Sequence, residues 1–174
     1  IDVPKSRRNV SPDEVKQLVQ WLSPGILPIG VFVNHPVEKV AALLNDGTLS
    51  AAQLHGQENA AYLTALRSLT DKPIIQAFSV CSAAVLEQAE HSTADYILLD
   101  SGKGGTGIPF DWSLLKGFSR PFFLAGGLTP DNLSQAIRLL HPFAVDVSSG
   151  VETAGKKEKA KILAAVAATR SCHL

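Results

Sequence analysis

The sequence has few cysteines, no net charge and no long apolar run, and each absence excludes a class of protein. Cys81 and Cys172 form no CxxC or Cys/His metal spacing, and two cysteines are too few for a disulfide framework. Sixteen Lys plus Arg balance sixteen Asp plus Glu, so no overall field attracts nucleic acid or an anionic membrane. No apolar run approaches the roughly 20 residues of a membrane span, and residues 1–10 lack the apolar core of a secretory signal. We therefore expect a cytoplasmic protein with free thiols, without a metal site, and with no nucleic-acid or membrane partner.

Length and composition indicate one soluble domain. The chain has 174 residues, of which 45% are hydrophobic and 18% charged. This is enough for one hydrophobic core and too little for two ordinary domains. We therefore interpret residues 1–174 as a single domain.

Six apolar segments suited to β-strands alternate with amphipathic helices along the chain. Each predicted strand is followed by a helix, and the connections are short. Such alternation predicts a parallel sheet with right-handed crossovers. The predicted strands are residues 29–33, 51–55, 73–78, 96–99, 122–125 and 143–147.

The helix near the N-terminus is predicted to bury one face, and the helix near the C-terminus is predicted to have a solvated face. Ser11-Pro12-Asp13-Glu14 has the capping-box arrangement that begins a helix. Apolar residues then follow at helical spacing and predict one buried face, formed by Val15, Leu18, Val19 and Leu22. The lysine cluster from Lys156 to Lys161, near the C-terminus, is interpreted as a solvated helix face.

Two architectures accommodate such a sheet, the open doubly wound sheet and the closed barrel. In an open sheet the ligand-binding loops gather at one topological switch point. Here polar or glycine-rich sequence follows nearly every predicted strand, as at Asn34, His55-Gly56, Ser79, Asp100, Gly126-Gly127 and Ser148–Gly150. This distribution favours the rim of a (β/α)8 TIM barrel, whose chemistry lies on the loops after the strands.

The stretch from Ala94 to Gly107 joins a buried strand, a carboxylate and a glycine-rich loop. The strand is too apolar for a sheet with one wet face, and Asp100 stands at its carboxyl end. Gly104, Gly105 and Gly107 allow backbone conformations that turn several N–H groups toward one anion. Taken alone, Asp100 could be a loop carboxylate and the glycines tight turns. Together they suggest chemistry on a phosphorylated substrate.

Seven short motifs occur in order from the first residues almost to the C-terminus. They are PKSRR with VSP (4–12), GVFVN (30–34), QLHG (53–56), LLD with GGTG (98–107), FDW (110–112), AGGL (125–128) and VDVSSGVE (145–152). As an ordered set they resemble the phosphoribosylanthranilate isomerase family of tryptophan biosynthesis. Other phosphate-binding barrel enzymes, such as indole-3-glycerol-phosphate synthase or a histidine-pathway isomerase, do not explain KSRR, QLHG and VDVSSGVE together.

The resemblance implies an Amadori rearrangement that needs no cofactor. The furanose ring of N-(5-phosphoribosyl)anthranilate opens, and the product is 1-(2-carboxyphenylamino)-1-deoxyribulose 5-phosphate. The resemblance makes Asp100 the general acid and Arg8 the group that holds the anthranilate carboxylate. It places Asp146 near the bridging amine and His55 in the lining of the site. The phosphate cradle that it implies is formed by Gly105, Thr106, Gly126, Gly127, Ser149 and Gly150.

The sequence departs from the family pattern at its beginning. The family opens with a strand ending in a Lys-Ile-Cys-Gly motif, whose cysteine is the general base, and then a helix and a second strand. The present sequence matches the family after that unit, so about six βα units are expected. We interpret Cys81 as a packed thiol and not as a replacement base.

This departure leads to an expectation about activity and partners. The isolated chain is expected to be catalytically defective, and a noncatalytic phosphate-ligand-binding or complementing module is the alternative function. Bare strand edges favour a homo-oligomer or a complementing N-terminal segment as partner. The small-molecule partner is the phosphosugar-anthranilate substrate.

Overall fold

The computed structural model describes residues 1–4, 6–100 and 112–172, and the chain forms two compact units. The first unit comprises residues 1–77 and 92–96, and the second comprises residues 78–91 and 97–174. In the described residues, no helix has the length and apolar character needed to cross a membrane.

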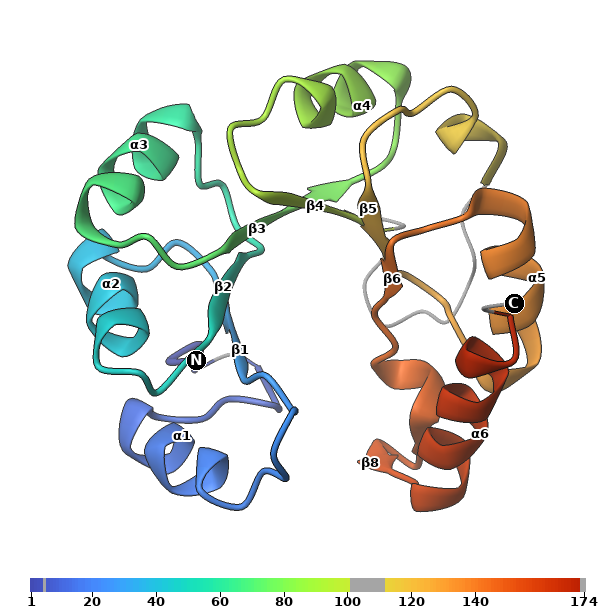
Figure 1. Cartoon of the computed structure of the whole chain (residues 1–174), viewed down its shortest axis with the longest axis horizontal. Helices are drawn as coiled ribbons and strands as arrows, with labels where there is room; N and C mark the ends of the chain where they lie inside the picture. Colours follow the sequence, from blue (N-terminus) through green and yellow to red (C-terminus); the bar gives the residue numbers. More distant parts are fainter. Residues whose placement is uncertain (5, 101–111, 173–174) are drawn as a thin grey trace. The chain divides into compact units, whose positions relative to one another are not determined.

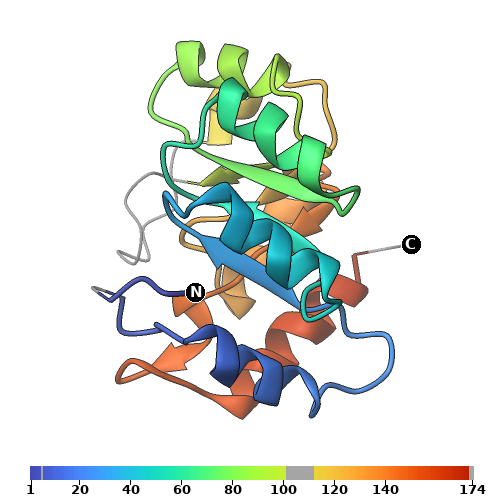
Figure 2. The same ribbon diagram turned by 90° about the vertical axis from the view of Figure 1, so that its left-hand side faces the viewer.

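The first unit is built on parallel strands covered by helices on one face. Strands β1 (Ile29–Phe32), β2 (Ala51–Leu54) and most of β3 (Ile74–Ser79) pair in this order. Helices α2 (Val37–Asn45) and α3 (Ala60–Leu69) lie side by side along the strands (Figure 1, Figure 2). All four residues of β2 are buried, because this strand has a neighbour on each side and helices over one face. The three predicted strands of this unit are confirmed.

The first helix, α1 (Pro12–Val19), begins as predicted but is less buried than predicted. The Ser11 N–H donates to Glu14 Oε2 at 2.7 Å, and the Ser11 hydroxyl accepts from the Glu14 N–H at 3.3 Å, which completes the capping box. Of the predicted buried face, Val15 is buried, whereas Leu18 is 56% exposed and Leu22 is 41% exposed. The prediction was wrong for two reasons. Helix α1 ends at Val19, so the helical period does not reach Leu22, and within the helix no element of the described chain covers Leu18.

The second unit repeats the plan of the first. Most of β4 (Tyr96–Asp100), together with β5 (Phe122–Leu124) and β6 (Ala144–Val145), belongs to this unit, and these parallel strands pair in this order. The three central residues of β4 are fully buried, which confirms the predicted strand with two covered faces. The helices are α4 (Ala83–Glu90), η1 (Trp112–Leu115, a 3-10 helix), α5 (Pro130–Leu140) and α6 (Lys159–Arg170). Helices α5 and α6 pack side by side (Figure 1).

Several local features of the second unit differ from the prediction. The last parallel strand has only two residues, and a short 3-10 helix, η2 (Ser149–Val151), follows it. A hairpin of β7 (Glu152–Thr153) and β8 (Lys156–Lys157) precedes α6 and was not predicted. Its turn uses Ala154 and Gly155, both in the left-handed region, with φ values of 50° and 78°.

Candidate active site

The carboxyl ends of β4, β5 and β6 bring the predicted acidic residues to one edge of the second unit. Asp100 is the last residue of β4, and Asp146 directly follows β6. Both are half-buried. The Asp146 N–H donates to the Leu124 carbonyl at 2.8 Å, and the Asp100 carbonyl accepts from the Val80 N–H at 2.8 Å. These bonds fix the backbone of both carboxylate residues where the strands end.

The first predicted phosphate loop follows β5 at the same edge. Gly126 and Gly127 have φ values of 85° and 66°, a region that favours glycine. The Asn132 side chain donates to the Gly127 carbonyl at 3.0 Å and accepts from the Thr129 N–H at 2.9 Å. The capping of α5 therefore holds the glycine loop in place.

The second predicted phosphate loop, after β6, lies against the first. A Cβ added to Gly150 would lie 1.8 Å from the Leu128 carbonyl oxygen and 3.0 Å from Thr129 Cα. Only a residue without a side chain permits so close an approach of two backbones. Ser149 precedes Gly150 in η2 and is half-buried. The two loops thus form one rim segment, whereas Gly105 and Thr106 lie outside the described residues.

Two lysines that were interpreted as solvated also hold the second loop. Lys157 Nζ donates to the Ser148 carbonyl at 2.7 Å and lies 3.1 Å from the Glu152 carboxylate, which is only 6% exposed. Lys161 Nζ donates to the Glu152 carbonyl at 3.0 Å and to Thr153 Oγ1 at 2.7 Å. Both side chains are still solvated, at 45% and 40% exposure, so the interpretation was right about exposure. It missed these bonds because the hairpin that brings the lysines and their acceptors together was not predicted.

The two remaining predicted residues belong to the first unit. His55 directly follows β2, and its N–H donates to the Phe32 carbonyl at 2.9 Å. His55 Nδ1 lies 3.0 Å from Gln53 Oε1, and the residue is half-buried. Arg8 is exposed in the loop before α1, where its N–H donates to Ser6 Oγ at 3.1 Å. The structure therefore gathers Asp100, Gly126, Gly127, Asp146, Ser149 and Gly150 in one unit and places His55 and Arg8 in the other.

The described residues contain no group of three His, Cys, Asp or Glu side chains that could hold a metal ion. Cys81 is a free thiol in the loop between β3 and α4. It is exposed, so the interpretation of Cys81 as a packed thiol was wrong, because the residue stands in a connecting loop outside the core. Exposure alone gives this thiol no role in proton transfer.

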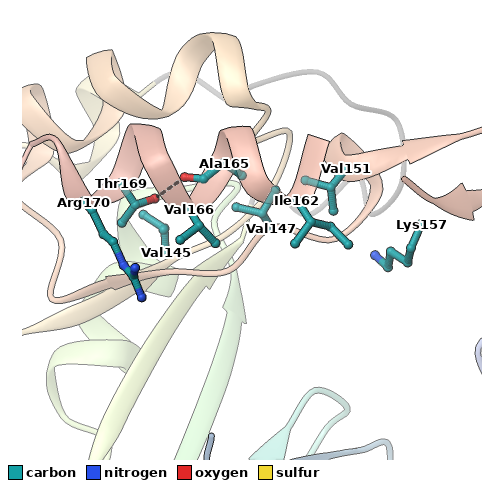
Figure 3. Close-up of a pocket in the computed structure, with 9 residues that line it drawn as sticks. All are labelled: Val145, Val147, Val151, Lys157, Ile162, Ala165, Val166, Thr169 and Arg170. Atoms are coloured by element: carbon teal, nitrogen blue, oxygen red, sulfur yellow. Dashed lines mark hydrogen bonds between the residues drawn. The ribbon is translucent and has the colours of Figure 1, made fainter. Parts of the chain in front are cut away.

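The second unit also contains an apolar hollow of about 530 Å³ (Figure 3). Its walls are mainly Val145, Val147 and Val151 from one side and Ile162, Ala165 and Val166 of α6 from the other. None of the predicted site residues lines it. Lys157, Thr169 and Arg170 are its polar lining residues, and the ammonium group of Lys157 is already bonded to Ser148 and Glu152. The hollow therefore lacks the convergent backbone N–H groups that the glycine loops offer to a phosphate. We therefore place the candidate active site at the strand ends and not in this hollow.

Comparison with known proteins identifies relatives along nearly the whole chain. The family model of N-(5'-phosphoribosyl)anthranilate isomerase matches residues 1–168. The chain is 43% identical over 164 residues to the isomerase of Desulforudis audaxviator, an alignment that covers 90% of this chain and 78% of that relative. It superposes on the crystal structure of the Thermotoga maritima isomerase with a TM-score of 0.86 and 36% identity, over 97% of this chain and 84% of the other.

A further solved structure carries a ligand. It is a phosphoribosylanthranilate isomerase in complex with reduced 1-(o-carboxyphenylamino)-1-deoxyribulose 5-phosphate. Its TM-score to this chain is 0.83 at 35% identity, and the alignment covers 97% of this chain and 84% of that one. This chain has parallel strands alternating with helices. Together with the two structural matches, this arrangement confirms the predicted (β/α)8 barrel class.

Proposed function

Because the chain belongs to the N-(5'-phosphoribosyl)anthranilate isomerase family, an isomerase family of tryptophan biosynthesis, we propose a division of roles among its strand-end residues. The substrate is N-(5-phosphoribosyl)anthranilate, and the reaction is the aldose-to-ketose Amadori rearrangement. The observation that carries the proposal is the gathering of two carboxylates and two glycine loops at one strand edge. A cytoplasmic location and self-association are further parts of this proposal.

Asp100 is the general acid of the proposed mechanism. Its carboxyl group donates a proton to the furanose ring oxygen as the C1–O bond breaks and the bridging nitrogen forms a double bond to C1. Loss of the C2 proton to a base then gives an enolamine, which becomes the ketose when C1 takes up a proton and the C2 hydroxyl loses one. The resemblance assigns that base to a motif not matched in this sequence, and we assign it to none of the described residues.

The other residues bind and orient the substrate. The phosphate occupies the rim segment of Gly126, Gly127, Ser149 and Gly150, where backbone N–H groups suit an anion. Gly105 and Thr106 complete this cradle. Asp146 lies beside the bridging amine, Arg8 holds the anthranilate carboxylate, and His55 lines the site.

Turnover and analogue binding together test the function. The full-length gene product is expected to convert N-(5-phosphoribosyl)anthranilate to the ketose product. Chromatography measures the amount of product formed. The same protein is also expected to bind the reduced product analogue, measured by calorimetry. Binding of the analogue without any turnover would contradict the isomerase assignment and would favour a noncatalytic binding module.

Replacing Arg8 by Lys is expected to weaken analogue binding. A guanidinium offers a carboxylate two parallel hydrogen bonds, and an ammonium group does not reproduce that geometry. Loss of one charge-assisted bond corresponds to about a tenfold lower affinity. The matched control is Arg7→Lys, at the neighbouring exposed position. Equal effects of the two substitutions in calorimetry would remove Arg8 from its proposed role.

A further inference from the structure

One buried carboxylate in the first unit joins the loops that follow β1 and β2. Glu58 is only 6% exposed. Its Oε1 accepts from the Asn34 N–H at 2.6 Å, and its Oε2 accepts from the Gly56 N–H at 2.8 Å. Asn34 belongs to the loop after β1, and Gly56 to the loop after β2. Because β1 and β2 are parallel neighbours, both loops lie at the same strand edge.

The Asn34 side chain also joins these two loops, as an acceptor of a hydrogen bond from the loop after β2. Asn34 has a left-handed backbone, with φ of 53°, and its Oδ1 accepts from the Gln57 N–H at 2.7 Å. A Cβ added to Gly56 would lie 2.6 Å from Asn34 Oδ1 and 2.9 Å from the Asn34 backbone nitrogen, so this close approach of the two loops favours glycine. The Glu58 carbonyl accepts from Gln76 Nε2 at 2.7 Å, which ties the loop to β3.

A hydroxyl beside the carboxylate extends the arrangement. Tyr62 donates from its hydroxyl to the His35 carbonyl at 2.9 Å, again in the loop after β1. Burial, together with the Glu58 and Glu38 carboxylates, raises the pKa of Tyr62 to about 12. The hydroxyl therefore stays a donor throughout the neutral range and supports the same loop.

The cost of burying a charge indicates what Glu58 is for. A buried carboxylate is unfavourable unless hydrogen bonds compensate it, and apolar residues of similar volume often stabilise a fold as well or better. Here both oxygens are used on backbone N–H groups of two rim loops, and Gly56 is the residue next to His55. A role in fixing a unique loop geometry accounts for this arrangement better than stability alone.

We infer that Glu58 is a positioning residue of the isomerase, whose carboxylate clamps the loops after β1 and β2 and so presents His55 to the substrate. The inference rests on the proposed function, because His55 is assigned to the substrate site there. Glu58 acts through His55 and touches no reacting atom in this scheme.

The test compares Glu58→Gln with Asp95→Asn. In Glu58→Gln one carboxylate oxygen becomes an amide NH₂ group, which cannot accept a hydrogen bond. One of the two backbone N–H groups then faces another donor, and one bond of the clamp is lost. Asp95 also accepts a backbone N–H, from Ile74 at 2.7 Å, and pairs with Arg67, but it serves the amino end of β3. Asp95→Asn therefore removes another carboxylate that accepts a backbone N–H, one that is 42% exposed and lies away from the proposed site.

We expect Glu58→Gln to lower the affinity for the reduced product analogue about tenfold or more and to speed amide hydrogen exchange at Asn34 and Gly56. Asp95→Asn is expected to lower the melting temperature less, because its side chain is 42% exposed, and to leave analogue affinity within about twofold. Equal affinity losses in the two variants, or unchanged exchange at Asn34 and Gly56, would overturn the inference.

A second variant covers the case in which Glu58→Gln fails to fold. Asn34→Gly keeps the left-handed backbone and both bonds to Glu58 but removes the Oδ1 acceptor of Gln57. It is expected to fold and to lower analogue affinity by a smaller factor, because the loops keep the Glu58 bonds but lose the bond from the Gln57 N–H. Unchanged affinity together with unchanged exchange at Gly56 and Gln57 would mean that contacts between these two loops do not position His55. If the wild-type protein itself does not bind the analogue, the proposed function fails, while the exchange rates of Asn34 and Gly56 still decide whether Glu58 holds the loops.

Discussion

Replacing Asp100 by Asn is expected to lower kcat by about 10²–10⁴-fold, the usual contribution of a general acid, while binding of the reduced product analogue is retained. The amide has the size of the carboxyl group but has no acidic proton to give to the ring oxygen. The backbone is expected to stay in place because Ile97, Leu98 and Leu99 are fully buried and the Asp100 carbonyl bonds to Val80. Steady-state kinetics on the full-length gene product gives kcat, and calorimetry gives the affinity for the analogue.

The control for this prediction is Asp131→Asn in the same unit. Asp131 is exposed in the first turn of α5, where its loss is expected to change kcat by no more than about twofold. If Asp100→Asn keeps kcat within that range, the general acid is another group. A parallel loss of kcat and analogue affinity would instead mean that Asp100 binds substrate without a specific role in proton transfer.

The strands were predictable because their sequence pattern follows directly from their burial. Residues 96–99 form an apolar run, and β4 is covered on both faces; Ala51–Leu54 has a weaker pattern but occupies its place in the alternation. The hairpin of β7 and β8 was not predictable. Each of its strands has two polar residues, and its turn begins at Ala154, a residue that rarely takes a left-handed conformation.

The positions of Asp100 and Asp146 at strand ends were predicted from the sequence, because they depend only on residue type and on where a strand ends. Roles that depend on contacts between loops were not predicted. Glu58 follows QLHG by two residues, yet only the folded chain shows that its carboxylate reaches the Asn34 N–H, 24 residues away in sequence. The one signal in the sequence that could have indicated Glu58 is its place in a glycine-containing loop directly after a buried strand. The burial expected for α1 failed for a related reason, because periodicity does not reveal which neighbours cover a helix.

Replacing Gly150 by Ala is expected to weaken binding of the reduced product analogue about 100-fold, near the upper range for an overpacked site. The new Cβ would lie 1.8 Å from the Leu128 carbonyl oxygen and 2.8 Å from its carbonyl carbon. These are backbone atoms next to Thr129, the residue that caps α5, so no flexible side chain can move aside. The loops after β5 and β6 must separate, and the proposed phosphate cradle opens.

Gly117→Ala distinguishes this steric effect from the ordinary cost of losing a glycine. Gly117 has φ of 94° and no atom within 4 Å of an added Cβ, so its substitution strains the backbone without a clash. Both variants are expected to melt at a lower temperature, but only Gly150→Ala is expected to lose affinity for the analogue in calorimetry. Because the clash lies between the two glycine loops, affinity for inorganic phosphate should fall in parallel with affinity for the analogue. If the Gly150→Ala protein binds both ligands as tightly as the wild type does, the phosphate binds elsewhere. The close contact of these two loops would then have no role in phosphate binding.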